Sequence, residues 1–345
     1  MKSGYCRKQY VIAKIRACNF LSTFEHRETG FVLATNSSIS ATSDRTIRLG
    51  TRGSQLAMVQ SNWVKSQLES LGHAVELIEI KTDGDVKTGP LAQIGGQGLF
   101  TKRLQEALLC EEVDLAVHSL KDLPTEDHDG LTIAAVPERE NPADALVCEQ
   151  MTDLQSLPER AIVGTGSVRR AAQLLHLRPD LEIRDIRGNV DTRLRKLVEE
   201  PYQAIVLACA GLNRMGLADK ISFEFAVDQL LPAVGQGCLG LETRRGDSTT
   251  IDAVVKLDHS SSFARAMAER SMLRTLYAGC LSPVGAFSQV DQGVLMLAGV
   301  VLSEDGKQRV FAKETGTSDK PAELGNRVAE QLIKKGADQL LKRGD

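Results

Sequence analysis

The sequence predicts an α/β protein with a small α+β domain at its C-terminal end. From residue 47 to residue 208, short apolar strands alternate with amphipathic helices, which is typical of parallel or mixed sheets covered by helices. Two junctions, 49–54 and 163–167, close a strand with Gly-Thr and open a helix with Ser. This similarity suggests two like α/β domains, although six residues are too few to establish a repeat. After residue 258 the pattern changes to one long helix followed by strands.

Apolar periodicity predicts the individual elements. Val59, Trp63 and Leu68 recur at helical spacing and predict a helix over Ser54–Leu71. The same reasoning predicts strands at Thr46–Gly50, Ala74–Lys81, Asp114–His118, Ala161–Gly164, Leu181–Ile186 and Ala204–Ala208, helices at Thr101–Cys110, Ser167–Leu177 and Val190–Glu199, and, in the last domain, a helix at Phe263–Tyr277, strands near Val294–Val301 and Val310–Lys313, and a terminal helix.

Composition excludes several classes of function. The 345 residues hold 42 Lys and Arg against 45 Asp and Glu, a net charge of −3, so affinity for anions must come from local arginine clusters. We therefore expect no nucleic-acid partner. No apolar run approaches the ~18 residues of a membrane helix, and we expect no membrane contact. The seven Cys and six His form no C-x-x-C or H-x-x-x-H pair, so we expect no metal site and a reducing compartment.

Residues 1–46 differ from the rest of the chain. They hold seven Lys and Arg, three acidic residues and eleven Ser and Thr, with no sustained periodicity. A basic, hydroxyl-rich leader is typical of an organellar transit peptide, which would place the protein in a plastid or another organelle. A disordered extension or an over-long start is the preferred interpretation, and we expect a cytoplasmic protein.

The segment 164–170, GTGSVRR, has the features of an anion site. Two glycines allow a ligand to approach the backbone, and Ser167 can cap the helix that follows. Free N–H groups of the first helical turn attract anions, and Arg169 and Arg170 can add bidentate bonds to carboxylates. The alternative is a capped helix with solvated arginines.

A second arginine pair follows the next strand. Arg187 and Arg193 lie in IRGNVDTR, at the junction of a strand with a helix. Because the carboxyl ends of parallel strands gather at one edge, these arginines could converge with Arg52, Arg169 and Arg170. We infer an acidic ligand with several carboxylates or phosphates. No P-loop motif is present.

Two further segments carry reactive side chains. In DLAVHSLKDLP, a buried strand leads directly into Ser119, Lys121 and Asp122, and an ionised Asp in a cleft can steady a developing cation. A simple turn-stabilising Asp/Lys pair is the alternative. Cys280 lies in the Gly/Pro-rich loop GCLSPVG and could act as a nucleophile or a covalent anchor, although its spacing alone fits an inert cysteine better.

Together these segments resemble the hydroxymethylbilane synthase family, also called porphobilinogen deaminases. The resemblance runs from about residue 47 to residue 285, with the motifs in the family's order. The combination of HS-x-KD-x-P, RGN-x-x-TR and GC-x-x-P-x-G is specific, whereas the last 60 residues match only in general character. The motifs are RLGTRGSQLA, IKTDGD, GGQGLFTKRLQEALL, DLAVHSLKDLPT, VGTGSVRRAAQL, IRGNVDTRLRKL, AIVLACAGLNRMG, LPAVGQGCLGLETR and AGCLSPVGA.

The resemblance implies a three-domain fold. Two α/β domains similar to type II periplasmic binding proteins flank a cleft, and a small α+β domain carries the cofactor cysteine. The boundaries expected on this basis are a leader at 1–46, a discontinuous domain 1 at 47–140 and 235–257, domain 2 at 141–234, and domain 3 at 258–345.

The resemblance also implies the reaction. Four porphobilinogen molecules would condense head to tail, with release of ammonia, into hydroxymethylbilane on a dipyrromethane cofactor held by a thioether. Asp122 matches the catalytic carboxylate and Cys280 the cofactor anchor, and a monomer is expected. The positions matched to cofactor binding are Ser119, Lys121, Arg169, Arg170 and again Asp122, and those matched to substrate binding are Arg52, Ser54, Arg187 and Arg193.

One departure from the family pattern leaves an alternative open. Gln97 stands where most relatives have Lys, in the segment 84–98 that we interpret as a mobile lid. A catalytically inactive relative is therefore one alternative. A non-catalytic binding protein that closes on a small anion is the other, and it would need neither Asp122 nor Cys280.

Overall fold

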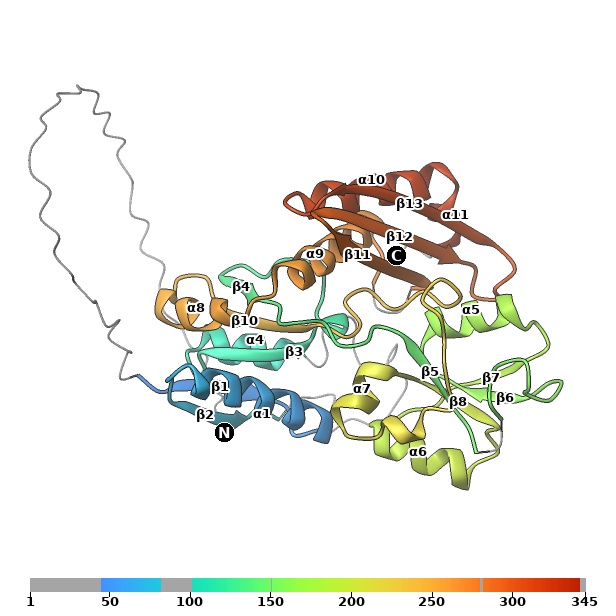
Figure 1. The fold of residues 1–345 in the computed structure, drawn as a ribbon, viewed down its shortest axis with the longest axis horizontal. Coiled ribbons are helices and arrows are strands. Elements are labelled where there is room, and N and C mark those ends of the chain that lie inside the picture. Colours follow the sequence, from blue (N-terminus) through green and yellow to red (C-terminus); the bar gives the residue numbers. More distant parts are fainter. Residues whose placement is uncertain (1–44, 82–100, 150, 280–281, 342–345) are drawn as a thin grey trace, which may run out of the picture. The chain divides into compact units, whose positions relative to one another are not determined.

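The computed structural model describes residues 45–81, 101–149, 151–279 and 282–341. Within these ranges the chain forms two five-stranded mixed sheets and one three-stranded antiparallel sheet (Figure 1). Only residues 45 and 46 of the predicted leader are among the described residues. The predicted lid at 84–98 and Cys280 lie outside them. No helix in the described ranges is both long and apolar enough to cross a membrane.

The first sheet has the strand order β2-β1-β3-β10-β4. Strand β1 runs parallel to β2 and β3, whereas β10 runs antiparallel to β3 and β4. Helices α1 and α8 cover one face of this sheet, and α4 covers the other. Alternate residues of the strands are buried against these helices. These elements are β1 (Ile47–Thr51), α1 (Gln55–Ser70), β2 (Val75–Glu79), α4 (Lys102–Leu109), β3 (Leu115–Ser119), β4 (Leu131–Ala135), β10 (Leu239–Arg244) and α8 (Ser248–Val254).

The second sheet repeats this topology with the order β7-β6-β8-β5-β9. Its fourth strand, β5, is likewise antiparallel to both neighbours. The two Gly-Thr…Ser junctions noted in the sequence connect β1 to α1 and β6 to α5. Strands β1 and β6 each hold the second place in their sheet, so the two junctions occupy equivalent positions in the two sheets. The elements are β5 (Asp144–Val147), β6 (Ile162–Gly164), α5 (Val168–Leu177), β7 (Glu182–Arg184), α6 (Val190–Glu199), β8 (Ala204–Ala208), α7 (Cys209–Arg214) and β9 (Phe223–Glu224).

The chain crosses between the sheets twice, and the two crossing segments lie side by side. The N–H of Glu140 donates to the carbonyl of Gly237 at 3.2 Å, and Nε of Arg139 donates to the carbonyl of Gln236 at 2.8 Å. Gly237 has φ +88°, and a Cβ there would lie 2.3 Å from the Glu140 carbonyl oxygen. Only glycine fits this close approach, which holds the segment that leads into β5 beside the segment that leads into β10.

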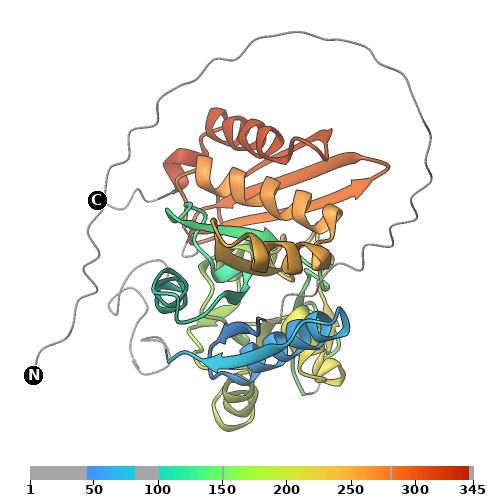
Figure 2. The same ribbon diagram turned by 90° about the vertical axis from the view of Figure 1, so that its left-hand side faces the viewer.

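The third sheet has the order β11-β12-β13, with α9 and α10 packed on one face (Figure 2). Its opposite face meets α5 of the second sheet, where Ala298 and Val300 pack against Ala172. The elements are α9 (Ser260–Thr275), β11 (Val284–Asp291), β12 (Val294–Leu302), β13 (Arg309–Thr317), α10 (Pro321–Lys334) and α11 (Ala337–Leu340).

The predicted fold class, two like α/β domains with a small α+β domain, is confirmed by these sheets. Several predicted elements agree closely with the structure, including the helix at Val190–Glu199 and the strand at Ala204–Ala208. The domain boundaries stay a prediction. Apolar periodicity did not predict β4, β5, β9, β10, β11, α7 and α8.

Candidate active site

Asp122 stands on a short turn that follows β3. This turn, a single 3₁₀ turn over Leu120–Asp122, is anchored by Leu120, which is buried and donates its N–H to the Cys238 carbonyl at 3.0 Å. From α9, Nη1 of Arg270 donates to the Leu123 carbonyl at 2.9 Å. These two hydrogen bonds hold the backbone on both sides of Asp122, while its carboxylate stays exposed.

Ser119 and Lys121 flank the same turn. The Ser119 hydroxyl lies 3.0 Å from Nε2 of Gln60 on α1. Lys121 is half-buried, and its Nζ lies 3.5 Å from Oε1 of Gln236 on the second crossing segment. The sequence-predicted Ser119, Lys121 and Asp122 therefore lie together at the carboxyl end of β3.

Arg169 and Arg170 occupy the first turn of α5, behind the predicted Ser167 cap. Both side chains are buried, at 4% and 5% residue exposure. Nη1 of Arg169 donates to Oδ2 of Asp144 at 2.7 Å, and Nε and Nη2 of Arg170 donate to Oδ1 at 2.9 and 2.7 Å. The two arginines therefore share one internal carboxylate.

Asp144 is the site residue that the sequence analysis missed. It is fully buried at the first position of β5 and also accepts a bond from Nε2 of Gln236 at 2.9 Å. Burial opposes ionisation, but Arg169 and Arg170 outweigh it and hold the pKa of the Asp144 carboxyl well below its usual range. The interpretation of two solvated arginines is wrong, because both guanidinium groups are inside the protein.

Arg187 and Arg193 lie at the start of α6. Nε of Arg193 donates to the Gly188 carbonyl at 2.8 Å, and Nε of Arg187 lies 2.5 Å from Oδ2 of Asp185. Gly188 has φ +115°, and a Cβ there would come within 2.6 Å of the Thr192 side chain. The glycine of the RGN motif is thus required by the turn that presents Arg193.

Electrostatic interactions connect the Asp122 turn with the arginines of the second sheet. Burial lowers the pKa of Lys121 to about 8, with Asp122 raising it and Arg170 lowering it. Burial also lowers the pKa of Arg193 to about 10, and again Arg170 lowers it while Asp122 raises it. Asp122 and Arg170 thus act on both cations, so residues from both sheets share one charged neighbourhood.

Arg52 and Ser54 lie at the other predicted junction. Ser54 caps α1, its hydroxyl oxygen accepting from the Ala57 N–H at 3.4 Å, and Arg52 is half-buried. This confirms the local structure that the sequence predicts there, while the role of both residues in ligand binding stays a prediction.

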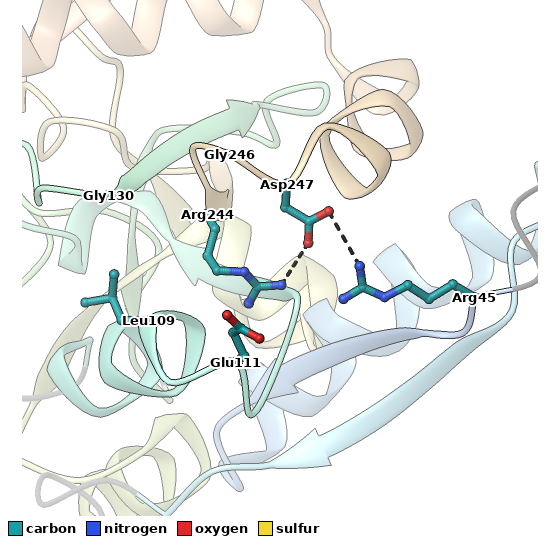
Figure 3. A pocket seen from close by; sticks show the side chains of 7 residues that line it. All are labelled: Arg45, Leu109, Glu111, Gly130, Arg244, Gly246 and Asp247. Carbon is teal, nitrogen blue, oxygen red and sulfur yellow. Dashed lines mark hydrogen bonds and ion pairs between the residues drawn. The ribbon is translucent and has the colours of Figure 1, made fainter. Parts of the chain in front are cut away.

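Two cavities lie outside this neighbourhood. One, of about 450 Å³, is lined by charged residues that pair with one another: Arg45 and Arg244 both approach Asp247 (Figure 3). The other, of about 430 Å³, lies beside the crossing segments and includes Gln60, the partner of Ser119. Neither is lined by Asp122 or by the arginines that share Asp144.

Comparison with known proteins identifies the family. The model "Porphobilinogen deaminase, dipyromethane cofactor binding domain" matches residues 47–252, and "Porphobilinogen deaminase, C-terminal domain" matches residues 263–334. The chain belongs to the porphobilinogen deaminase family. This confirms the expected membership, the assignment as a transferase of tetrapyrrole biosynthesis, and the dipyrromethane cofactor that the matching model names.

Curated relatives in the family match most of the chain. The porphobilinogen deaminase of Trichlorobacter lovleyi is 46% identical over 298 residues, covering 86% of this chain and 95% of the relative. That of Pelotomaculum thermopropionicum is 48% identical over 302 residues, covering 87% and 97%. The chain therefore corresponds to nearly the whole length of these relatives.

Some solved binding proteins show a weaker similarity. The methionine-binding protein MetQ has a TM-score of 0.40 at 14% identity, covering 65% of this chain and 94% of its own. A periplasmic substrate-binding protein of an ABC transporter from Coxiella burnetii has a TM-score of 0.41 at 14% identity, covering 65% and 96%. The fold assignment rests on the sheet topology described above.

Proposed function

We propose that this chain condenses four porphobilinogen molecules head to tail, with release of ammonia, and liberates hydroxymethylbilane. The exposed Asp122 carboxylate, set among the cations Lys121, Arg170 and Arg193, carries the proposal. Each pyrrole ring of this substrate bears two carboxylates, so a growing chain needs several cations. The local arginine cluster supplies them in a protein whose net charge is −3.

Asp122 is the proposed catalytic group. Loss of ammonia from an aminomethyl group leaves a positive charge delocalised onto the pyrrole nitrogen. An exposed carboxylate on a rigid turn can stabilise that charge without reorganising, and it can exchange a proton with the pyrrole N–H. The anchoring of the turn through Leu120 and Arg270 supports this role, since it fixes the carboxylate in place.

We propose that Ser119, Lys121, Arg169 and Arg170 hold the carboxylates of the dipyrromethane, which is joined by a thioether to Cys280. When bound, this group supplies the ring carbon to which the first porphobilinogen is attached. The described residues fit it: the neighbourhood is rich in cations, and the buried Nε of Arg169 has no hydrogen-bond partner within the described part of the chain. Cys280 itself lies outside that part.

The incoming substrate would be held by Arg52, Ser54, Arg187 and Arg193. Arg193 is the best supported of these, because the charges of both Asp122 and Arg170 act on its guanidinium group. Among the described residues the Arg193 guanidinium donates only from Nε, to the Gly188 carbonyl, so its Nη1 and Nη2 groups remain for a carboxylate.

Intact mass of the purified protein beside Cys280→Ser tests this proposal. We expect extra mass equal to two linked pyrrole units on the wild type alone, and ammonia release from porphobilinogen by the wild type alone. A wild type that stays unmodified after incubation with porphobilinogen, and releases no ammonia, would favour an inactive relative.

We further propose that the protein is a cytoplasmic monomer. Seven cysteines without a C-x-x-C pair suit a reducing compartment. Light scattering on the purified protein gives the mass in solution, and a dimer mass contradicts the monomer. A fluorescent reporter fused behind residues 1–46 should remain in the cytosol of a plant cell, whereas import into a plastid would support the transit peptide.

A further inference from the structure

The buried carboxylate of Asp144 has no role in the function proposed above. It cannot meet a ligand directly, because it is fully buried and its oxygens accept bonds from Arg169, Arg170 and Gln236. Its three partners nevertheless include both arginines that the proposed function assigns to the cofactor.

We propose that Asp144 is a positioning residue that holds Arg169 and Arg170 in the orientation that binds pyrrole carboxylates. This inference rests on the proposed function of the two arginines. Each oxygen of Asp144 takes a different arginine, Oδ2 receiving Arg169 and Oδ1 receiving Arg170. Backbone carbonyls hold each guanidinium group as well. Nη1 of Arg169 donates to the Leu231 carbonyl at 2.7 Å, and Nη1 of Arg170 donates to the Val206 carbonyl at 2.9 Å.

The charge balance explains why one carboxylate serves two arginines. Two adjacent guanidinium groups repel each other when buried, and the pKa of Arg169 is lowered first by its own burial, with Arg170 adding to the effect. Asp144 removes one unit of positive charge and leaves one. The pair can therefore stay buried and still attract an anion, which a second internal carboxylate would prevent.

Gln236 extends the arrangement to the first sheet. Its Nε2 donates to Oδ1 of Asp144 at 2.9 Å, and its Oε1 accepts from Nζ of Lys121 at 3.5 Å. Only this orientation of the carboxamide satisfies both neighbours, because a carboxylate needs a donor and an ammonium needs an acceptor. Gln236 thus joins the arginine pair to the turn that carries Asp122.

Two matched controls exist within the same chain. Asp114 is also fully buried and receives Arg45, Arg48 and Arg244, but it lies at the far end of β3 from the Asp122 turn. Gln203 is a half-buried glutamine whose Oε1 accepts the Ile162 N–H at 2.7 Å, at the opposite end of β6 from α5. Asp114→Asn and Gln203→Leu therefore each remove an internal polar contact without changing a residue of the proposed site.

The experiment compares Asp144→Asn with Asp114→Asn, and Gln236→Leu with Gln203→Leu, in the full chain. Thermal unfolding, intact mass and the KM for porphobilinogen are measured for each. We expect all four variants to unfold at lower temperature. Only Asp144→Asn and Gln236→Leu should lose cofactor mass or raise KM, the former at least tenfold, which is the effect of one misplaced charge-assisted bond.

Asp144→Glu provides a second route if Asp144→Asn does not fold. It keeps the negative charge but moves the carboxylate by one methylene, so we expect folding with KM still raised. Wild-type mass and KM in folded Asp144→Asn or Asp144→Glu would overturn the positioning role. A wild type without cofactor mass or turnover would instead refute the proposed function, and the positioning role would be refuted with it.

Discussion

Arg139 and Glu269 form a buried ion pair, with 2.6 Å between Nη1 and Oε1 and both side chains almost without exposure. Arg139 belongs to the first crossing segment and Glu269 to α9. The second crossing segment joins the same carboxylate, because the Gly235 N–H donates to Oε2 at 2.8 Å. Glu269, on a helix packed against the third sheet, therefore bonds to both segments that connect the two α/β sheets.

Glu269→Gln should strongly destabilise the protein. The change leaves the Arg139 guanidinium buried without its counter-charge, which costs about 3–5 kcal/mol. Urea unfolding measures the loss. Glu330→Gln, an exposed change on α10, should stay within about 0.5 kcal/mol of wild type. A Glu269→Gln variant as stable as Glu330→Gln would show that the pair contributes nothing.

Asp122→Asn should nearly abolish turnover and leave stability unchanged. The side chain is exposed, so the protein loses no buried contact, whereas the loss of a proton-transferring carboxylate lowers kcat by about 10²–10⁴-fold. Steady-state turnover and thermal unfolding measure the two effects. Asp129→Asn, another exposed aspartate nearby in the chain, should turn over normally. Normal turnover in Asp122→Asn would remove this carboxylate from the mechanism.

Cofactor loading should slow as the pH rises through about 8. Burial lowers the pKa of Lys121 to about 8, so above this pH the ammonium loses its proton, and each further unit lowers the charged fraction about tenfold. Only the charged form attracts carboxylates. The measurement is the rate at which apoprotein gains cofactor mass from porphobilinogen, as a function of pH.

Lys121→Arg is the control for this pH dependence. Arginine keeps its charge above pH 8, so the decline near that pH should disappear even if the rate is lower throughout. Identical pH profiles for wild type and Lys121→Arg would assign the decline to another group.

Gly306→Ala should destabilise the contact between the third domain and α5. Gly306, in the turn between β12 and β13, has φ +72°, and a Cβ there would lie 2.5 Å from the Ala172 carbonyl oxygen. The strained backbone and the clash together cost about 2–5 kcal/mol. Gly293→Ala shares the strain, with φ +80°, but has nothing within 4 Å. Urea unfolding should show a clearly smaller loss for Gly293→Ala, and equal losses would exclude the clash.

Local sequence signals predicted the parallel strands and their helices well. The Ser54 and Ser167 caps, the helix at Val190–Glu199 and the strand at Ala204–Ala208 all follow from apolar periodicity and capping chemistry, which act within a few residues. The position of Lys121 and Asp122 directly after a buried strand was predicted from the same local pattern. These features depend on neighbours in the chain, and the sequence displays such neighbours directly.

Strands β5 and β9, and the part played by Asp144, could not be predicted in this way. Strand β5 is only four residues long and β9 only two, too short for a periodic signal. The partnership of Asp144 with Arg169 spans 25 positions and arises because two distant segments are buried together. One clue was available: two adjacent arginines in a largely apolar helix need an internal counter-charge.

The double crossing of the chain has a consequence for biosynthesis. The second sheet is complete once β9 has been made, at residue 224, whereas the first sheet lacks its fourth strand until β10 ends at residue 244. A polypeptide leaving the ribosome can therefore finish its second sheet before its first. The usual order, in which the N-terminal part folds first, is reversed here, and β3 and β4 must wait for β10, which is made more than a hundred residues later.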